Sequence, residues 1–130
     1  MCLDKLAKFE PCEVGYKVMK IDFVGDLHGE FYNGEVVPQN VWLDEKKFRL
    51  GYYSKRRRIV NPCWNCSYPF GFHIYHYKKD ALSWWADASY QVCVKVAIKE
   101  PRAVGYQNNR RITVAKQIKV LSIVKQASKS

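Results

Sequence analysis

The chain has 130 residues, and because 48 % of them are hydrophobic it can bury one core as a single domain, residues 1–130, without a disulfide framework. No apolar run reaches the ~20 residues of a membrane span, which argues against an integral membrane protein. The net charge of +10 favours anionic partners, namely phosphate polymers, acidic protein surfaces or anionic lipid.

The charge is unevenly distributed along the chain. Residues 1–50 hold 7 Lys and Arg against 9 Asp and Glu, whereas residues 51–130 hold 15 against 3. We therefore expect the functional surface in the second part. The N-terminus lacks the basic-then-apolar layout of a signal peptide, and the five cysteines are odd in number. Both features predict a cytoplasmic protein with reduced thiols, in the host cytoplasm if a phage encodes it.

The first thirty residues predict a short helix, a strand and a turn. Residues 1–13 favour a short, loosely ordered helix. Residues 15–24 favour a strand, and the apolar period slips after Met19, as at a β-bulge. Residues 25–29 contain two glycines and favour a turn, in which His28 is expected to be solvated.

Two further strands are predicted before the basic loop. Residues 34–43 are a broken apolar run in which Pro38 removes a ladder donor, so this run should lie at a sheet edge. Residues 47–53 alternate between apolar and polar positions, as in a strand with one wet face.

The clearest pattern lies between residues 70 and 99. Residues 70–77 are aromatic and favour a strand, residues 79–88 place apolar side chains on one helical face, and residues 91–99 alternate strictly. Residues 118–124 favour a central strand, and residues 126–130 form a tail.

The segment between the strands predicted over 91–99 and 118–124 is expected to interrupt the sheet. Glu100 and Pro101 should end the strand, Asn108 and Asn109 favour a turn, and residues 112–115 favour a helical turn. The pattern as a whole predicts an α+β domain: a twisted, mostly antiparallel sheet of about five to seven strands, with one main helix (79–88) packed on one face.

Cationic clusters beside aromatic residues predict a binding surface for nucleic acid or another anionic partner. Lys and Arg neutralise phosphates, and exposed aromatic rings stack on unpaired bases. The alternative is that these are solvated loops and core aromatics. The predicted contact residues are Tyr52, Tyr53, Lys55, Arg56, Arg57, Arg58, Lys78, Lys79, Arg110, Arg111 and Lys116.

A Cys-x-x-Cys pair, Cys63 and Cys66, is the one candidate metal site. The spacing allows both thiolates to bind one zinc ion. His73 and His76 follow, but on a strand they face opposite sides, so at most one could join the pair. The alternative is a tight turn with no metal. No other cofactor is expected, because no phosphate-binding loop, nucleophile elbow or carboxylate pair is present.

Several apolar motifs resemble a loose group of small phage and bacterial proteins. They are Gly15-Tyr16-Lys17-Val18, Gly71-Phe72-His73-Ile74-Tyr75, Asp80-Ala81 and the strand 92–96, and together they touch about half of the chain. The resemblance implies a phage or mobile-element context, in which small charged proteins often inhibit host defence, as anti-CRISPR proteins do.

A second similarity is to the ADP-ribosyltransferase core, in which a Gly-aromatic strand, a helix and a valine-rich strand follow one another. It implies a nicotinamide pocket with Tyr16, His73 and Glu100 as candidates. Tyr16-Lys17 departs from the expected first motif, and no Ser-Thr-Ser stretch is present.

The sequence therefore predicts a small basic protein, not an enzyme, that binds RNA or a ribonucleoprotein. A phage-encoded inhibitor of a nucleic-acid-guided defence system is the expected role. An acidic host protein is an alternative partner, and an enzyme of the ADP-ribosyltransferase type that uses a nucleotide cofactor is the alternative function.

Overall fold

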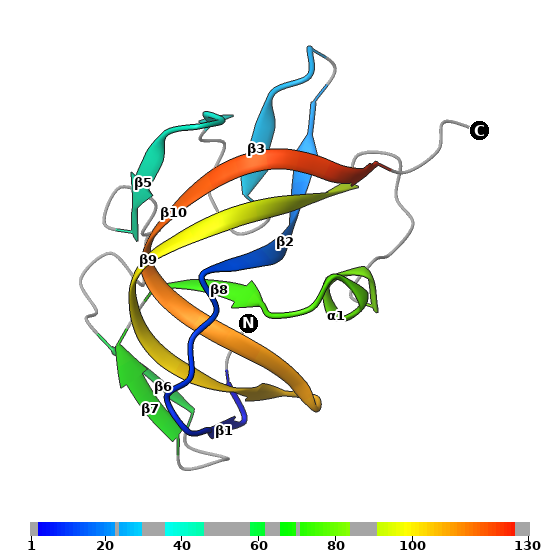
Figure 1. Cartoon of the computed structure of the whole chain (residues 1–130). Helices are drawn as coiled ribbons and strands as arrows, with labels where there is room; N and C mark the ends of the chain where they lie inside the picture. The colour runs from blue at the N-terminus through cyan, green and yellow to red at the C-terminus, as the bar shows by residue number, and fades with distance from the viewer. Residues whose placement is uncertain are drawn as a thin grey trace.

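The computed structural model describes residues 3–22, 24–29, 36–45, 58–61, 66–69, 71–83 and 91–126 (Figure 1). These residues form an eight-stranded antiparallel sheet, a separate two-stranded ladder and a short helix. The elements are β1 (Lys5–Leu6), β2 (Val14–Ile21), β3 (Leu27–Gly29), β4 (Val36–Val37), β5 (Trp42–Asp44), β6 (Arg58–Asn61), β7 (Cys66–Pro69), β8 (Phe72–Tyr75), α1 (Lys78–Ser83), β9 (Gln91–Gln107) and β10 (Arg110–Gln126). Among them, no helix is long and apolar enough to cross a membrane.

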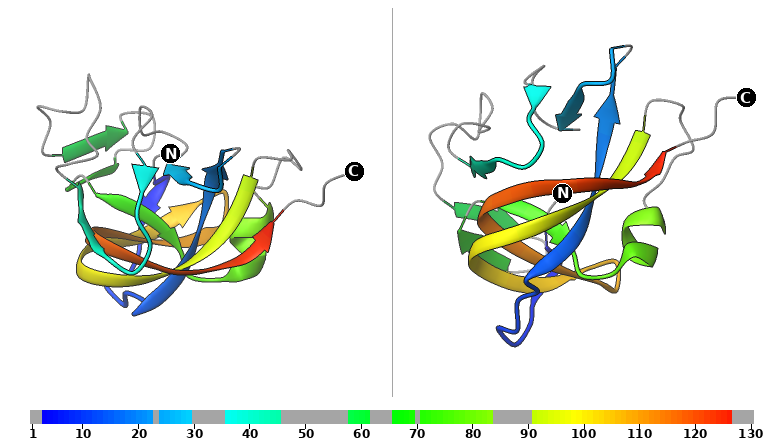
Figure 2. Two further views of the ribbon diagram at one scale, coloured as in Figure 1. Left: turned by 90° about the horizontal axis from the view of Figure 1, so that it is seen from above. Right: turned by 45° about the horizontal axis from the view of Figure 1, so that its top comes forward.

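The hairpin of β9 and β10 organises the sheet. Each strand has 17 residues, and the two run side by side in a strong curve across the molecule (Figures 1 and 2). Asn108 and Asn109 join them with φ angles of 50° and 64°. Two central residues with positive φ make a turn whose twist matches that of the flanking strands, and asparagine tolerates this conformation.

Shorter strands pair with both outer edges of this hairpin. On the free side of β9 lie β2 and β1, and on the free side of β10 lie β8 and β5. Tyr16 of β2 also pairs with Tyr75 of β8, so the sheet curls until strands from its two sides meet. β10 has described partners on both sides as far as Val120, so the central position predicted for residues 118–124 is confirmed for 118–120, whereas among the described residues 121–124 pair only with β9.

The curl buries two apolar clusters. Val92, Val94 and Val96 alternate along β9 and belong to the first, as their period of two predicted. The first cluster comprises Met19, Leu27, Val37, Leu43, Phe72, Ile74, Val92, Val94, Val96, Ile118 and Val120. The second comprises Leu3, Val18, Tyr68, Tyr75, Ala81, Cys93, Ala103, Ile112 and Val114, so it brings the N-terminal segment, β7 and α1 against the sheet.

The predicted α+β class is wrong, because the described chain is mostly sheet. The main helix predicted over 79–88 is described only as α1, which has six residues, and residues 84–88 lie outside the described ranges. The Ser83 hydroxyl donates a hydrogen bond of 2.6 Å to the Asp80 carbonyl oxygen, and such a bond competes with the helical ladder. So short a helix contributes Ala81 to the second cluster but forms no layer.

The predicted break after Lys99 is also wrong, because β9 runs through it. Pro101 lies opposite Ala115 at a register shift, and Glu100 has a φ of 54°. A β-bulge tolerates both the positive φ angle and the proline. The extra residue of a bulge interrupts the ladder of backbone hydrogen bonds, so the N–H group that proline lacks is not needed there. The helical turn predicted over 112–115 is instead part of β10.

The N-terminal third also differs from its prediction. Residues 5–6, expected to be helical, form β1 and pair with β9. The strand predicted over 15–24 is confirmed as β2, but its register with β9 is continuous and shows no bulge. Residues 27–29, predicted as a turn, form β3, and β4 before Pro38 ends the strand order at an edge, as expected. The strand predicted over 47–53 lies outside the described residues.

Candidate nucleic-acid interface

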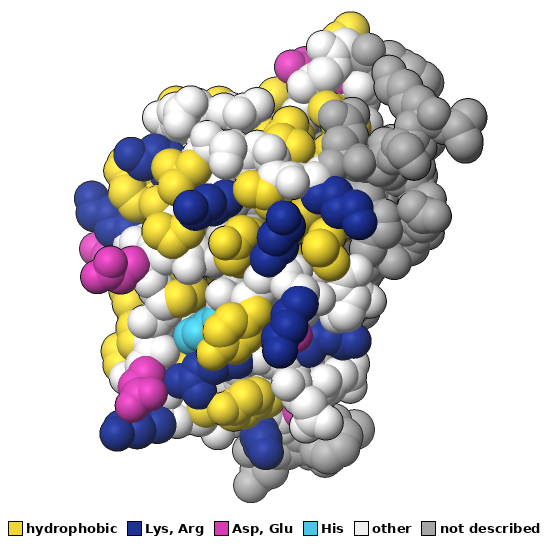
Figure 3. All heavy atoms as spheres, turned by 45° about the vertical axis from the view of Figure 1, so that its right-hand side comes forward, with side chains coloured by type: hydrophobic (Ala, Val, Ile, Leu, Met, Phe, Trp, Pro, Cys, Tyr) yellow, Lys and Arg dark blue, Asp and Glu magenta, His cyan; other side chains and the backbone are white. Residues whose placement is uncertain are grey.

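Lysine and arginine side chains are interleaved with hydrophobic ones over one face of the molecule (Figure 3). The β9–β10 hairpin supplies much of this pattern, because alternate residues of a strand point to the same side. Lys119 of β10 lies opposite Ala97 of β9, and Arg111 lies opposite Tyr106. Two features stand out on the hairpin: an exposed tryptophan with two lysines, and a polar pocket near the hairpin end.

The first feature, here named the tryptophan clamp, consists of Trp42, Lys99 and Lys119. Trp42 of β5 lies opposite Lys119 in the register and is 39 % exposed. The Nζ atom of Lys119 is 4.9 Å from the centroid of the Trp42 ring, and that of Lys99 is 5.5 Å away. Both distances suit cation–π attraction.

The lysines of the clamp are not neutralised within the described residues, where neither Lys99 nor Lys119 forms an ion pair. Lys95 lies on the same side of β9, four residues before Lys99. The clamp therefore combines an exposed aromatic ring with positive charge that is available to an anion.

The second feature, here named the hairpin pocket, is an open pocket of about 500 Å³ between α1 and the end of the hairpin. Its walls carry two tyrosine rings, each with a cation beside it. Lys79 Nζ lies 5.8 Å from the Tyr77 centroid, and Arg111 Cζ lies 5.7 Å from that of Tyr106. The lining residues are Glu10, His76, Tyr77, Lys79, Asp80, Tyr106, Asn109 and Arg111.

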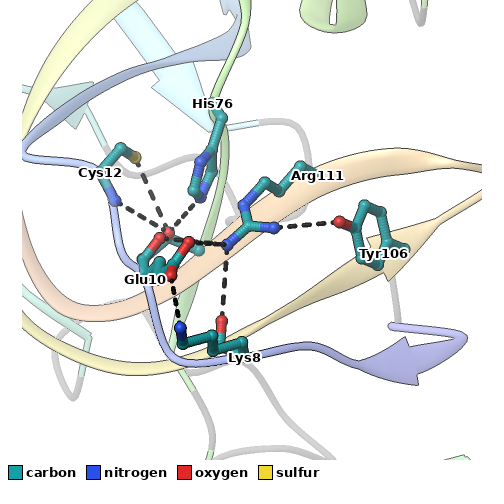
Figure 4. A network of polar contacts seen from close by, with 7 residues as sticks. Lys8, Glu10, Cys12, His76, Tyr106 and Arg111 are labelled. Carbon is teal, nitrogen blue, oxygen red and sulfur yellow. Dashed lines mark hydrogen bonds and ion pairs between the residues drawn. The ribbon is translucent and has the colours of Figure 1, made fainter.

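Arg111 holds the wall of this pocket together (Figure 4). Its guanidinium donates hydrogen bonds to the Tyr106 hydroxyl at 3.0 Å and to the carbonyl oxygens of Lys8 and Glu10 at 3.4 Å each. One Glu10 carboxylate oxygen lies 3.8 Å from it. Arg111 therefore fastens the N-terminal segment to the hairpin, which leaves fewer of its donors for a ligand.

The Thr113 hydroxyl, the Cys12 thiol and the His76 imidazole lie close together near Arg111. The Thr113 hydroxyl lies 2.6 Å from His76 Nε2 and 3.7 Å from the Cys12 sulfur, and it accepts a hydrogen bond from the Cys12 N–H. Burial raises the pKa of the Cys12 thiol, and the hydrogen bond with Thr113 only partly opposes this. Burial, with the nearby Arg111 charge, lowers the pKa of His76.

Both groups are therefore neutral near pH 7, and the arrangement does not provide the thiolate that nucleophilic catalysis requires. The same conclusion holds for Cys93, which is buried and whose thiol pKa is also raised by burial.

Of the predicted contact residues, the structure brings Lys79 and Arg111 together in the hairpin pocket. Lys78 adjoins Lys79 on α1, and Arg110 begins β10. Lys116 is already paired, with its Nζ atom 3.6 Å from Glu100 and 3.9 Å from Asp44. Arg58 begins β6. The residues that lie outside the described ranges are Tyr52, Tyr53, Lys55, Arg56 and Arg57.

The tryptophan clamp was missed from the sequence. Trp42 lies 57 residues before Lys99 and 77 before Lys119, and only the strand register brings them together. Trp42 stands in the broken apolar run 34–43, where a hydrophobic residue is expected to be buried. No local spacing could have indicated its exposure.

The described residues contain no group of three or more His, Cys, Asp or Glu that could hold a metal ion. Cys63 lies outside these residues, and Cys66 begins β7. The two histidines bond to different hydroxyls, His73 to Tyr68 at 3.0 Å and His76 to Thr113. A zinc site at the Cys63–Cys66 pair stays a prediction, which metal analysis of the purified protein tests.

His28 is not simply solvated, as was expected, but bonded to a nearby carboxylate. Its Nε2 atom lies 2.8 Å from a carboxylate oxygen of Asp22, and this hydrogen bond is the main reason that the Asp22 pKa is lowered. The other Asp22 oxygen accepts the N–H groups of Val24 and Asp26. The group closes the β2–β3 turn and has no role in either feature of the interface.

Comparisons with protein-family models, curated proteins and solved structures give no match. The geometry defines a curved antiparallel sheet with a cationic, aromatic face.

Proposed function

We propose that the protein binds single-stranded nucleic acid, RNA in particular, along the face that carries the tryptophan clamp and the hairpin pocket. The observation that carries the proposal is the exposed Trp42 ring with two lysines within 6 Å of its centroid, neither of which forms an ion pair among the described residues. A base stacks on an aromatic ring, and ammonium groups beside the ring neutralise the phosphates next to that base.

The exposed aromatic rings favour single strands over duplexes. Bases inside a duplex are stacked on one another and cannot reach an aromatic ring, whereas those of a single strand can. Lysines on long, flexible stems can turn from the ring to the backbone as a base stacks on Trp42. The hairpin pocket offers a second exposed ring, that of Tyr77, which is 53 % exposed.

The biological setting forms a further part of the proposal, and it rests on the resemblance to small phage and bacterial proteins. A cytoplasmic phage protein that binds RNA, or a ribonucleoprotein through its exposed RNA, can block a nucleic-acid-guided defence system. Purification from the native host followed by identification of the co-eluting RNA and protein tests this setting.

Fluorescence anisotropy of a labelled single-stranded RNA of about ten nucleotides tests the binding activity, since such proteins cover roughly 4–16 nucleotides. Trp42→Ala should weaken binding by about 1–3 kcal/mol, the usual worth of one base–aromatic stack. Trp42→Phe keeps a stacking ring and should recover most of this loss. Val24→Ala, at an exposed site on the β2–β3 turn, is the matched control and should bind as the wild type does.

Two results contradict the proposal. One is equal affinity of the wild type and Trp42→Ala at the same salt concentration. The other is competition by duplex RNA that is as effective as competition by the unlabelled single strand.

The ADP-ribosyltransferase alternative gains no support from the positions of its candidate residues. His73 is buried against Tyr68, whereas Glu100 is exposed and paired with Lys116. Neither residue lines the hairpin pocket. Turnover or protein modification after incubation with labelled NAD would revive this alternative.

A further inference from the structure

We propose that the hairpin pocket is a base-recognition subsite that holds one unstacked guanine of the bound strand through the Asp80 carboxylate. This inference rests on the proposed function and adds base selectivity to it. Phosphate contacts and stacking bind every sequence alike, whereas a carboxylate in the pocket discriminates among base edges.

Asp80 is the acceptor that is available in the pocket. Its carboxylate makes no hydrogen bond or ion pair with the described residues, and it lines the pocket beside Tyr77 and Lys79. Glu10, the other carboxylate of the lining, is already engaged. One of its oxygens lies 3.2 Å from Lys8 Nζ and the other 3.8 Å from Arg111.

A carboxylate favours guanine for a chemical reason. An ionised carboxylate only accepts hydrogen bonds, and its two oxygens lie side by side. The Watson–Crick edge of guanine presents two adjacent donors, the N1–H and the N2 amine. Adenine and cytosine present one exocyclic amine beside a ring acceptor, and uracil presents one N–H between two carbonyls that a carboxylate repels.

The other walls of the pocket complement the rest of a nucleotide. Tyr77 and Tyr106 offer ring faces for stacking, and Lys79 lies beside Tyr77, where its ammonium group can balance a phosphate. An open volume of about 500 Å³ accepts one base with its sugar. Asn109, at the hairpin turn, adds an exposed amide that can both donate and accept.

The pocket and the tryptophan clamp are separated by a fixed stretch of strand. Arg111 and Lys119 lie eight residues apart on β10, which corresponds to roughly 26 Å along an extended strand and less across a curved one. A strand that stacks on Trp42 therefore reaches the pocket with a base several nucleotides away. The effect of a guanine should accordingly depend on its position in the oligomer.

The experiment compares RNA decamers of uridine that carry a single guanosine, or a single inosine, at successive positions. Inosine keeps the N1–H and the ring carbonyl of guanine but lacks the N2 amine. We expect guanosine at the favoured position to tighten binding about tenfold over the all-uridine decamer, and inosine to lose most of that gain.

The Asp80→Asn variant should bind the all-uridine decamer at least as tightly as the wild type does, yet lose the preference for guanosine. Asp26→Asn removes one negative charge from the β2–β3 turn and is the matched control, which should keep the preference. Tyr77→Leu is a second variant, chosen because its ring is exposed, and it should also reduce the guanosine effect.

Equal binding of uridine, inosine and guanosine decamers at every position overturns the inference and leaves the proposed function standing. An unchanged guanosine preference in Asp80→Asn overturns it as well, whatever the result for Tyr77→Leu. If none of the decamers binds, the inference and the proposed function are overturned together.

Discussion

Acid should destabilise this fold through one buried histidine. The Leu3 N–H donates to the Tyr68 hydroxyl at 2.9 Å, and that hydroxyl lies 3.0 Å from His73 Nε2. The hydroxyl accepts the Leu3 N–H, and its own proton can be donated to the Nε2 atom of a neutral imidazole. Burial, with the charge of Lys17, lowers the pKa of His73 from 6.5 to about 3.

The sign and size of the effect follow from this difference in pKa. The unfolded chain protonates His73 below about pH 6.5, but the folded protein does not until about pH 3. Between these values the unfolded state binds the extra proton, so the free energy of unfolding falls as the pH falls. Each pH unit in this window removes about 1.4 kcal/mol, so the loss between pH 6.5 and pH 4.5 is about 2.5 kcal/mol.

Urea denaturation at a series of pH values measures this loss. Other groups also titrate in the window, so the informative quantity is the difference between the wild type and His73→Gln. The Gln side-chain carbonyl can accept the Tyr68 hydrogen bond but does not titrate. The wild type should lose about 2.5 kcal/mol more than the variant between pH 6.5 and pH 4.5. Parallel pH profiles for the two proteins would refute the reasoning.

Two further predictions concern the N-terminal segment and its thiol. A Cβ atom added at Gly105 would meet the Lys5 carbonyl oxygen and lie 2.8 Å from Leu3 Cδ1, so Gly105→Ala should cost about 1–3 kcal/mol of unfolding free energy; an unchanged urea midpoint would contradict this. The raised pKa of Cys12 should make its alkylation by iodoacetamide at pH 8 slower than that of free cysteine. Thr113→Val removes a hydrogen bond that lowers this pKa, so alkylation should slow further, and faster alkylation on peptide mapping would count against the network.

The sequence predicts correctly those elements whose pattern lies within the element itself. The alternation of Val92, Val94 and Val96 indicates their burial directly, because a period of two needs no knowledge of the partner strand. The prediction was wrong at Pro101, because a proline considered without its partner strand indicates the end of a strand. The proline is accommodated by a bulge opposite Ala115, and that bulge is a property of the pair of strands.

The candidate site likewise contains residues that a local sequence signal indicates and residues that only the fold brings together. Lys79 and Arg111 were chosen for their charge, and the pocket that joins them combines α1 with the hairpin, two elements far apart in the chain. Trp42 could not be chosen, because its two lysines reach it only through the register of β5 and β9 with β10. A buried role for His73 was equally hidden, since it depends on the hydroxyl of Tyr68.

The salt dependence of RNA binding tests the central claim most directly. For a single strand, the slope of log Kobs against log salt concentration becomes shallower by about 0.7 for each phosphate that the protein no longer neutralises. We expect Lys99→Ala/Lys119→Ala to reduce the slope by about 1.4. Trp42→Ala should weaken binding without changing the slope, because stacking releases no counterion. Identical slopes for the wild type and the double lysine variant would contradict the account.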